Sequence, residues 1–363
     1  MRVLAAAGDP GGARCLIAVL KSLENVGIDC SIVRHGFLDK EAPVRWHRES
    51  HHRAEMKGSV YQKIREGNYD IFLFSGSVDD GVPLEIGHIA RECGVYLVTI
   101  LDSWTSYSDR LKLEGKPVLY PDLYTVIDKH SYEQAIIEGI PADALHLTGQ
   151  PALFDLDCRV ESLEFTKRED WLSTKGLNPE KKTLLFISEP VESDHSSSRE
   201  SGRYRGYTEK IVLQQLLNSL ECFYSDLQLV ILPHPRENRI QLAATWNRYR
   251  GKLDGRILQD VDTLETVFFS DGIIGMASIV LYQAWLCRKP TLSCQPNLCR
   301  QDLYFLQELD DCVFVTDPIQ IDAEVKKWAK DVERGIPVVS LRKDFQIHEK
   351  APEQISSLIQ QLV

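Results

Sequence analysis

Short apolar runs alternate with longer amphipathic stretches along most of the chain. Apolar runs bounded by glycine, proline or polar residues predict buried strands, and apolar residues recurring every three or four positions predict helices. Strands that alternate with helices in this way are typical of parallel sheets covered by helices on both faces. In the first half, the pattern predicts strands at 3–7, 30–33, 71–75, 95–101 and 124–127, and helices at 13–23, 60–65, 82–93 and 131–138.

The pattern begins again in the second half of the chain. It predicts strands at 183–188, 227–232, 272–274 and 290–294, and helices at 208–220, 240–249 and 279–286. The stretch 155–180, between the two halves of the chain, is polar and charged and carries no strand signal. We therefore predict two Rossmann-like, doubly wound α/β domains that face each other across a central cleft, where ligands bind at the carboxyl ends of strands. The predicted boundaries are 1–157 for the first domain, 158–180 for a linker, 181–345 for the second domain and 346–363 for a C-terminal helix.

The C-terminal segment has apolar residues at the spacing of an amphipathic helix, namely Ile355, Leu358, Ile359 and Leu362. Such a helix either packs on the nearest domain or crosses back to the first one. A second segment, 192–207, is rich in serine, arginine and glycine and nearly free of aliphatic residues. It is predicted to be a mobile loop that orders over a bound ligand, with Arg199, Arg203 and Arg205 available for anions.

Composition narrows the function classes. The chain has 363 residues, of which 43% are hydrophobic and 26% charged, as in ordinary globular proteins. Its 42 Lys and Arg against 53 Asp and Glu give a net charge of −11, so nucleic acid is not an expected partner. No stretch approaches the ~20 apolar residues of a transmembrane segment. The nine cysteines are scattered without a Cys-x-x-Cys pair, which argues against disulfides and structural zinc and favours a cytoplasmic location.

A glycine-rich loop between the first strand and the first helix contains Gly8, Asp9, Gly11 and Gly12. Glycines at such a turn let a ligand approach the backbone and the amides at the helix start. The spacing is not Gly-x-Gly-x-x-Gly, so dinucleotide binding is not indicated. A tight turn without a ligand is the alternative.

Two further segments favour phosphate binding. His234 lies between two prolines directly after a predicted strand, and Arg236 follows it, so the imidazole is held at a strand end where it can reach a phosphate. Ser278 follows small residues and can cap the helix that contains Gln283, exposing its first amides to an anion. The alternatives are a structural histidine and a capped core helix.

Asp102 directly follows the predicted strand 95–101, near Trp104 and Tyr107. A carboxylate at a strand end beside aromatic surface suits a general base, and the two rings suit a platform for an acceptor. An Asx turn with locally packed aromatic residues is equally compatible with the sequence. Asp79 and Asp80 form a competing acidic pair. No His-Glu-x-x-His or Gly-x-Ser-x-Gly motif and no metal-ligand spacing occurs, so no metal is predicted.

The order of these motifs resembles the GT-B glycosyltransferase superfamily, which includes the non-hydrolysing nucleotide-sugar 2-epimerases. The resemblance is carried by the loop 8–12, the segment 148–151, the strand end Ser188-Glu189-Pro190 and the Gly-x-x-Ser helix start before Gln283. His234-Pro235 and Ser278 match the His-Pro and Ser motifs of bacterial sialyltransferases and related surface-polysaccharide transferases. Asp102 falls at their acidic motif, where Ser103 and Trp104 replace the second acid and the glycine.

The resemblance implies a GT-B fold whose second domain holds a UDP- or CMP-linked sugar as donor, with no further cofactor. His234 and Ser278 would contact phosphate and Gln283 the ribose or sugar, with Ser188, Glu189 and Arg236 on the donor side. The acceptor, a glycan, a lipid-linked or a small molecule, would enter beside the loop 8–12 and Asp102. The sequence is also compatible with a homodimer.

Three functions are compatible with these residues. The first is a metal-independent glycosyltransferase of surface glycan or glycoconjugate biosynthesis, with Asp102 as catalytic base. The second is a nucleotide-sugar 2-epimerase, whose members resemble the segment 234–238 in its Arg-Glu-Asn string after a histidine. The third is a catalytically idle GT-B-like binding protein.

Overall fold

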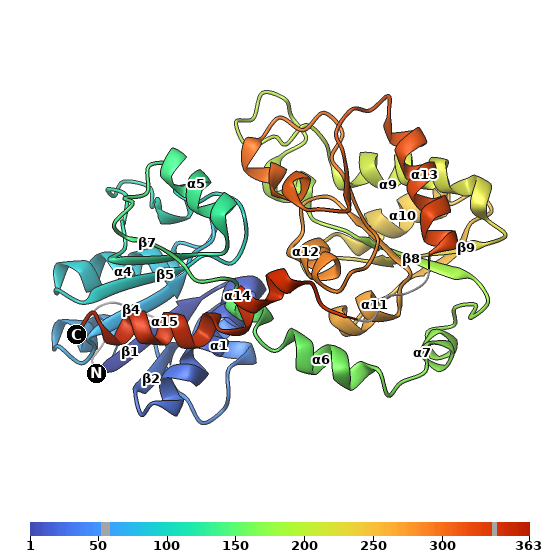
Figure 1. Ribbon diagram of the computed structural model, residues 1–363. Coiled ribbons are helices and arrows are strands. Elements are labelled where there is room, and N and C mark those ends of the chain that lie inside the picture. Colours follow the sequence, from blue (N-terminus) through green and yellow to red (C-terminus); the bar gives the residue numbers. More distant parts are fainter. Residues whose placement is uncertain (52–58, 336–339) are drawn as a thin grey trace. The chain divides into compact units, whose positions relative to one another are not determined.

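The computed structural model describes residues 1–51, 59–335 and 340–363. The chain forms two compact units, labelled here unit 1 (Met1–Leu156 with Asp344–Val363) and unit 2 (Asp157–Lys343). Each contains a parallel sheet with helices packed against it (Figure 1). The predicted α/β class with two doubly wound domains is therefore confirmed.

Seven strands make up the sheet of unit 1 in the described residues, in the spatial order β3-β2-β1-β4-β5-β6-β7. Every pair is parallel. The order reverses between β1 and β4, so the connections from these two strands leave in opposite directions and open a crevice at their carboxyl ends. The strands are β1 (Arg2–Ala7), β2 (Asp29–Val33), β3 (His47–Glu49), β4 (Ile71–Ser75), β5 (Tyr96–Ile100), β6 (Leu123–Val126) and β7 (Leu145–Leu147).

Helices cover both faces of this sheet because successive strand residues point to opposite sides. Val3, Ala5 and Ala7 pack in one cluster with the helix α1. Phe72 and Phe74 stack on each other on the opposite face, where Phe72 meets α4 at Gly87. The helices of unit 1 are α1 (Pro10–Asn25), α2 (Gly36–Glu41), α3 (Val60–Arg65), α4 (Val82–Glu92), α5 (Lys129–Ile137), α14 (Gln346–Glu349) and α15 (Ala351–Gln360).

The end of the chain completes unit 1. In Figure 1, α15 (red) lies along α1 (dark blue), and Ile355 and Ile359 are fully buried in the cluster that contains α1. Before it, the Nδ1 atom of the buried His348 accepts a hydrogen bond from the backbone N–H of Gln150 at 2.9 Å. Of the two arrangements compatible with the sequence, the helix therefore adopts the one that returns to the first domain.

Unit 2 repeats the topology with six strands in its described part, ordered β10-β9-β8-β11-β12-β13. The order reverses between β8 and β11. The strands are β8 (Lys182–Ile187), β9 (Leu227–Leu232), β10 (Asp254–Ile257), β11 (Gly272–Gly275), β12 (Thr291–Cys294) and β13 (Cys312–Val315). The helices are α6 (Leu156–Leu163), α7 (Arg168–Thr174), α8 (Val191–His195), α9 (Glu209–Leu220), α10 (Arg239–Tyr249), α11 (Thr263–Phe269), α12 (Ile279–Leu286) and α13 (Ile321–Arg334).

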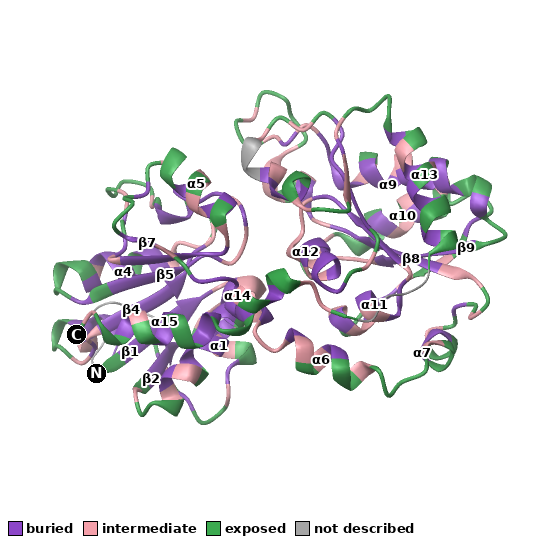
Figure 2. Ribbon diagram, in the orientation of Figure 1, coloured by how far each residue is buried: buried purple, intermediate pink, exposed green. Residues whose placement is uncertain are grey.

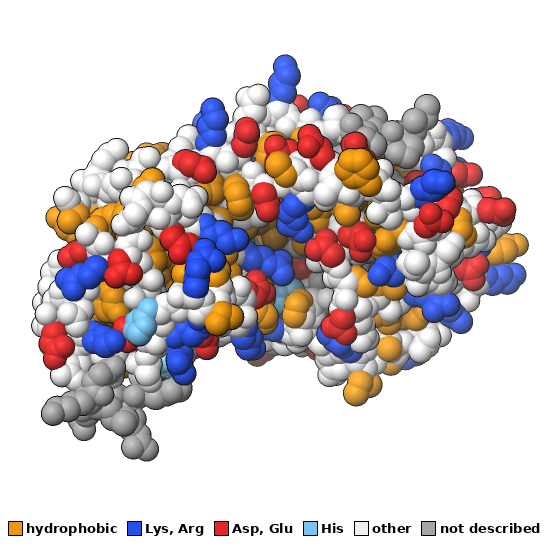
Figure 3. Space-filling model, turned by 90° about the horizontal axis from the view of Figure 1, so that it is seen from below, with side chains coloured by type: hydrophobic (Ala, Val, Ile, Leu, Met, Phe, Trp, Pro, Cys, Tyr) orange, Lys and Arg blue, Asp and Glu red, His pale blue; other side chains and the backbone are white. Residues whose placement is uncertain are grey.

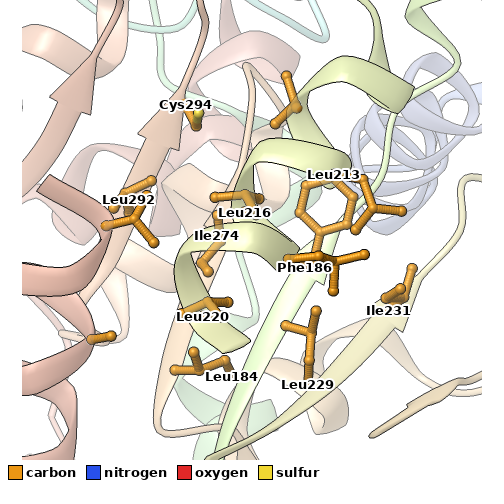
Figure 4. Close-up of a cluster of buried hydrophobic side chains, with 14 of the residues drawn as sticks. Leu184, Phe186, Leu213, Leu216, Leu220, Leu229, Ile231, Ile274, Leu292 and Cys294 are labelled. Carbon is orange, nitrogen blue, oxygen red and sulfur yellow. The ribbon is translucent and has the colours of Figure 1, made fainter. Parts of the chain in front are cut away.

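The core of unit 2 forms where one face of α9 meets the strands (Figure 4). Leu213, Leu216 and Leu220 project from α9 at helical spacing onto Leu184 and Phe186 of β8. All five side chains are almost inaccessible to solvent. In both units the strands consist mostly of buried residues, which are purple in Figure 2. This packing holds the carboxyl ends of the strands in fixed positions.

The surface carries both signs of charge. On the face shown in Figure 3, Lys and Arg side chains are interspersed with Asp and Glu rather than gathered in one basic stripe. Among the described residues, no helix combines the length and the apolar character needed to cross a membrane.

The packing of α15 yields a stability prediction. Replacing Ile355 with Ala leaves a cavity against α1, which typically costs about 2–5 kcal/mol. Hydrogen exchange of α1 peptides, measured by mass spectrometry, is expected to accelerate in Ile355→Ala because local opening becomes less costly. Gln354→Ala, one residue earlier on the exposed side, is the control. Equal exchange of α1 in the two variants would show that α15 does not stabilise unit 1.

Candidate functional site

The carboxyl ends of β8 and β11 bring several of the predicted residues together in unit 2. Ser188 and Glu189 follow β8, and Ala277 and Ser278 follow β11. These strands are neighbours at the point where the strand order reverses. Doubly wound sheets bind ligands at such a point because the diverging connections leave the crevice open.

Glu189 links the two strand ends. Its Oε1 atom accepts the backbone N–H of Ala277 at 2.7 Å, and its Oε2 atom accepts Nη1 of Arg205 at 3.4 Å. Burial raises the pKa of this carboxyl above its ordinary value, against the opposing effect of Arg205. Ser278 caps α12 by accepting the backbone N–H of Val280 at 3.1 Å, and its own O–H proton remains a donor. A carboxylate, a guanidinium and a helix start therefore meet at one point.

Ser188 holds the segment that follows β9 through a buried hydrogen bond. Its side chain is 1% exposed, and its hydroxyl donates to Oε1 of Glu237 at 2.6 Å. The backbone N–H of His234 donates to Oε2 of the same carboxyl at 3.1 Å. The buried hydroxyl of Ser188 therefore fixes the segment after β9 through Glu237, and its contact with the donor stays a prediction. Burial raises the pKa of Glu237 to about 7.

His234 is positioned as a hydrogen-bond donor. Its Nδ1 atom accepts the backbone N–H of Arg236 at 3.2 Å, which places the ring proton on Nε2. Burial, aided by the charge of Arg236, lowers the pKa of His234 to about 4, so the ring is neutral at pH 7. Arg236 pairs with Asp194 at 2.8 Å. Gln283 lies half-buried in the second turn of α12.

In unit 1, the glycine-rich loop lies between two carboxylates. A Cβ atom on Gly8 would stand 2.1 Å from Oδ2 of Asp80, and one on Gly11 would stand 2.6 Å from Oδ2 of Asp102. A larger residue at either position would therefore have to displace one of these carboxylates. Gly12 similarly abuts Ser75 of β4.

His35 and Asp80 form a pair beside this loop. Nε2 of His35 lies 2.8 Å from Oδ1 and 2.9 Å from Oδ2 of Asp80. The hydrogen bond to Asp80 raises the pKa of His35 despite partial burial, and the charge of Asp9 adds to the effect. His35 is not among the residues predicted from the sequence, although it follows the predicted strand 30–33 at the same edge of the sheet. This pair supports Asp80, the alternative to Asp102, as the acidic residue of the site.

Asp102 is held in an ion pair instead. Its Oδ1 atom accepts Nη1 of Arg110 at 2.7 Å, and the guanidinium is buried, with further bonds to the carbonyls of Gly76 and Thr105. The ion pair occupies Oδ1, whereas Oδ2 of Asp102 faces Gly11 of the glycine-rich loop. The role of Asp102 as catalytic base stays a prediction, beside the alternative that the His35–Asp80 pair offers.

The two rings of the predicted aromatic platform are buried inside unit 1. Trp104 is 1% and Tyr107 0% exposed, so neither ring offers surface to an acceptor. Trp104 donates through Nε1 to Asp128 at 2.6 Å, and the backbone carbonyl of Tyr107 accepts the hydroxyl of Tyr124 at 3.0 Å. Local packing, the alternative compatible with the sequence, is what the structure shows.

The predicted loop 192–207 is partly ordered by the fold. Its first residues belong to α8, and its end carries the buried side chains of Arg205 and Tyr207. The hydroxyl of Tyr207 bonds to Oε1 of Gln295 at 2.9 Å. The expectation that the segment lacks anchors is wrong at this end, because an aromatic ring fixes it there. Among the described residues, no group of three or more His, Cys, Asp or Glu side chains is arranged to hold a metal ion.

The raised pKa of Glu237 predicts a pH-dependent stability. The folded protein retains the proton up to about pH 7, whereas an unfolded glutamate loses it near 4.5. Stability is therefore lost as the pH rises between these values, by roughly 3 kcal/mol at most. Glu237→Gln, which cannot ionise, should remove this part of the pH dependence. Urea unfolding at pH 5 and pH 8 measures it, with the exposed Glu200→Gln as control; parallel profiles for Glu237→Gln and the parent would contradict the assignment.

No protein-family model matches the sequence, and no curated protein matches it. Solved structures do match over the whole chain. UDP-GlcNAc 2-epimerase from Methanocaldococcus jannaschii has 14% identity and a TM-score of 0.66, covering 99% of this chain and 100% of its own. The enzyme from Neisseria meningitidis, bound to UDP-GlcNAc, gives the same values. HepE from Anabaena, in complex with UDP and glucose, has 14% identity and a TM-score of 0.63, covering 99% and 95%. The chain therefore has the predicted GT-B fold.

Proposed function

We propose that this chain is a nucleotide-sugar-dependent glycosyltransferase. The observation that carries the proposal is the group at the ends of β8 and β11, where the Glu189 carboxylate, the Arg205 guanidinium and the Ser278-capped helix start converge. Proteins of the same fold have been solved with UDP, with UDP-GlcNAc, and with UDP and glucose. Their shared fold supports the view that this chain is a nucleotide-sugar-binding enzyme.

On the donor side, each group has a distinct chemical role. The amides at the start of α12 and the Nε2–H of His234 donate to the phosphate oxygens, and Glu189 accepts from ribose hydroxyls. Arg205 adds positive charge beside the same helix start. These groups stabilise the negative charge that develops on the departing nucleotide diphosphate, and they act without a metal ion.

On the acceptor side, His35 replaces Asp102 as the proposed base. Its Nε2–H donates to Asp80, which leaves Nδ1 as the proton acceptor and raises the basicity of the ring. The acceptor oxygen then loses its proton to Nδ1 as it bonds to the anomeric carbon. The bond from that carbon to the diphosphate breaks, and the electron pair leaves with the nucleotide.

A 2-epimerase is the second candidate. It is favoured by Glu237, whose pKa of about 7 and contact with the His234 backbone suit a group that gains and loses protons. Purified protein incubated with UDP- and CMP-sugars and a panel of acceptors separates the functions. Sugar transfer with release of nucleotide supports the transferase, a new sugar nucleotide supports the epimerase, and neither product supports an idle binding protein.

Removal of the His234 side chain tests the donor site. His234→Ala is expected to weaken binding of the nucleotide sugar by roughly 10- to 150-fold, the value of one hydrogen bond to a charged group. The melting temperature should stay near that of the parent. His146→Ala in unit 1 also removes a half-buried imidazole and is the matched control. Calorimetric titration measures both, and unchanged affinity in His234→Ala would refute the assignment.

Substitutions of Asp80 and Asp102 are expected to affect different properties, namely turnover and the melting temperature. Asp80→Asn is expected to lower turnover by about 10²–10⁴ with near-normal nucleotide affinity, because His35 loses its orienting carboxylate. Asp102→Asn leaves Arg110 buried without its charged partner and is expected mainly to lower the melting temperature. If Asp102→Asn instead abolishes turnover at an unchanged melting temperature, Asp102 is the base after all.

A further inference from the structure

The segment 148–151, which follows β7, has no role in the function proposed above. Its Gln150 is completely buried. This residue bonds to three parts of unit 1, namely α1, the loop after β5 and the C-terminal segment 344–363. These parts lie far apart in the sequence, so a single residue joins them.

The side-chain amide of Gln150 spans α1 and the loop that carries Asp102. Its Nε2 atom donates to the backbone carbonyl of Asp102 at 2.7 Å, and its Oε1 atom accepts the S–H of Cys15 at 2.8 Å. Oε1 also accepts the backbone N–H of Ala152 at 3.3 Å. Because a backbone carbonyl only accepts and a backbone N–H only donates, these partners fix the orientation of the amide.

The backbone of Gln150 is tied to the C-terminal segment. Its N–H donates to Nδ1 of the buried His348 at 2.9 Å. The preceding Gly149 has a φ of +90°, and a Cβ atom there would stand 2.4 Å from the carbonyl oxygen of Ile347. A side chain at position 149 would therefore push the C-terminal segment away from Gln150.

The contacts of Asp102 leave one of its carboxylate oxygens directed at the glycine-rich loop. Gln150 holds the backbone carbonyl, and Arg110 holds Oδ1 at 2.7 Å. Oδ2 faces Gly11, and within the part of the chain that the structure describes it accepts no hydrogen bond. A carboxylate oxygen fixed in this way is preorganised to accept a hydrogen bond from a hydroxyl group of a ligand.

We propose that Gln150 is a positioning residue of the acceptor side, which fixes Asp102 so that Oδ2 binds an acceptor hydroxyl beside Gly11. This inference rests on the proposed function and names the acceptor class. His35 lies beside Gly8 of the same loop and takes the proton of the attacking hydroxyl, so Asp102 binds a second one. The acceptor is therefore a polyhydroxylated molecule such as a sugar. Through His348, the position of Asp102 depends on the C-terminal segment.

Gln150→Met tests this role because it keeps the length of the side chain and removes the amide. With UDP-glucose as donor and glucose, galactose and N-acetylglucosamine as acceptors, the acceptor KM is expected to rise by roughly tenfold, the effect of one lost hydrogen bond. The kcat value and the Kd for UDP should stay near those of the parent, because only binding of the acceptor is weakened.

Ile355→Ala is the control for a general loss of stability. It weakens the packing of the same C-terminal segment without touching Gln150, and it should keep the acceptor KM of the parent. An unchanged acceptor KM in Gln150→Met would overturn the proposal, as would an equal rise in Ile355→Ala.

Gln150→Glu distinguishes positioning from packing by its dependence on pH. Burial raises the pKa of a carboxyl, and the protonated form still donates to the Asp102 carbonyl, whereas the ionised form cannot. Relative to the parent, the acceptor KM of Gln150→Glu is expected to be nearly normal at low pH and to rise as the pH increases. In Gln150→Met the ratio should not change with pH. A ratio that is independent of pH in both variants would contradict the role of the Nε2–H donor.

Hydrogen exchange separates this inference from the proposed function. Peptides covering 101–111 should exchange faster in Gln150→Met than in the parent and in Ile355→Ala. If the parent transfers no sugar, the proposed function fails, and faster exchange in Gln150→Met alone still assigns the ordering of the Asp102 loop to Gln150. If the parent transfers sugar while exchange and acceptor KM are unchanged in Gln150→Met, the positioning role fails and the function stands.

Discussion

Parallel pairing of every strand is the constraint on which both units depend. All strands of a sheet end at the same edge, and the order of the strands reverses between β1 and β4 and between β8 and β11. Residues far apart in sequence therefore meet at these edges, as Glu189 and Ala277 do through a 2.7 Å hydrogen bond. The apolar strands need no polar residues of their own, so the chemistry is confined to the short segments that follow them.

The two edges are built from different chemistry. In unit 1, carboxylates occupy the space beside the loop 8–12, and one of them orients His35. In unit 2, a capped helix start and the guanidinium of Arg205 lie beside Glu189. Proton transfer needs the first kind of group and stabilisation of a leaving anion needs the second. The edge of unit 1 therefore offers groups suited to proton transfer, and the edge of unit 2 offers groups suited to binding an anion.

The buried strands and the fold class could be predicted because apolar periodicity records burial directly. The short strands β3 and β10 escaped prediction, since edge strands such as His47–Glu49 carry polar residues. The long helix α13 was also missed, although Val325, Trp328 and Val332 show helical spacing. Among the candidate site residues, the positions of Glu189 and His234 directly after a strand could be predicted. The Asp102–Arg110 ion pair and the burial of Trp104 could not, because they depend on contacts that the local sequence does not encode.

The return of α14 and α15 to unit 1 makes unit 2 an insertion within unit 1. Translation proceeds from the amino end, so all of Asp157–Lys343 emerges from the ribosome before His348 and Ile355 exist to complete the first unit. Unit 2 can therefore reach its native fold while α1 still lacks the apolar surface that covers it. In the cell, the incomplete first unit is the part of the nascent chain that chaperones would have to protect.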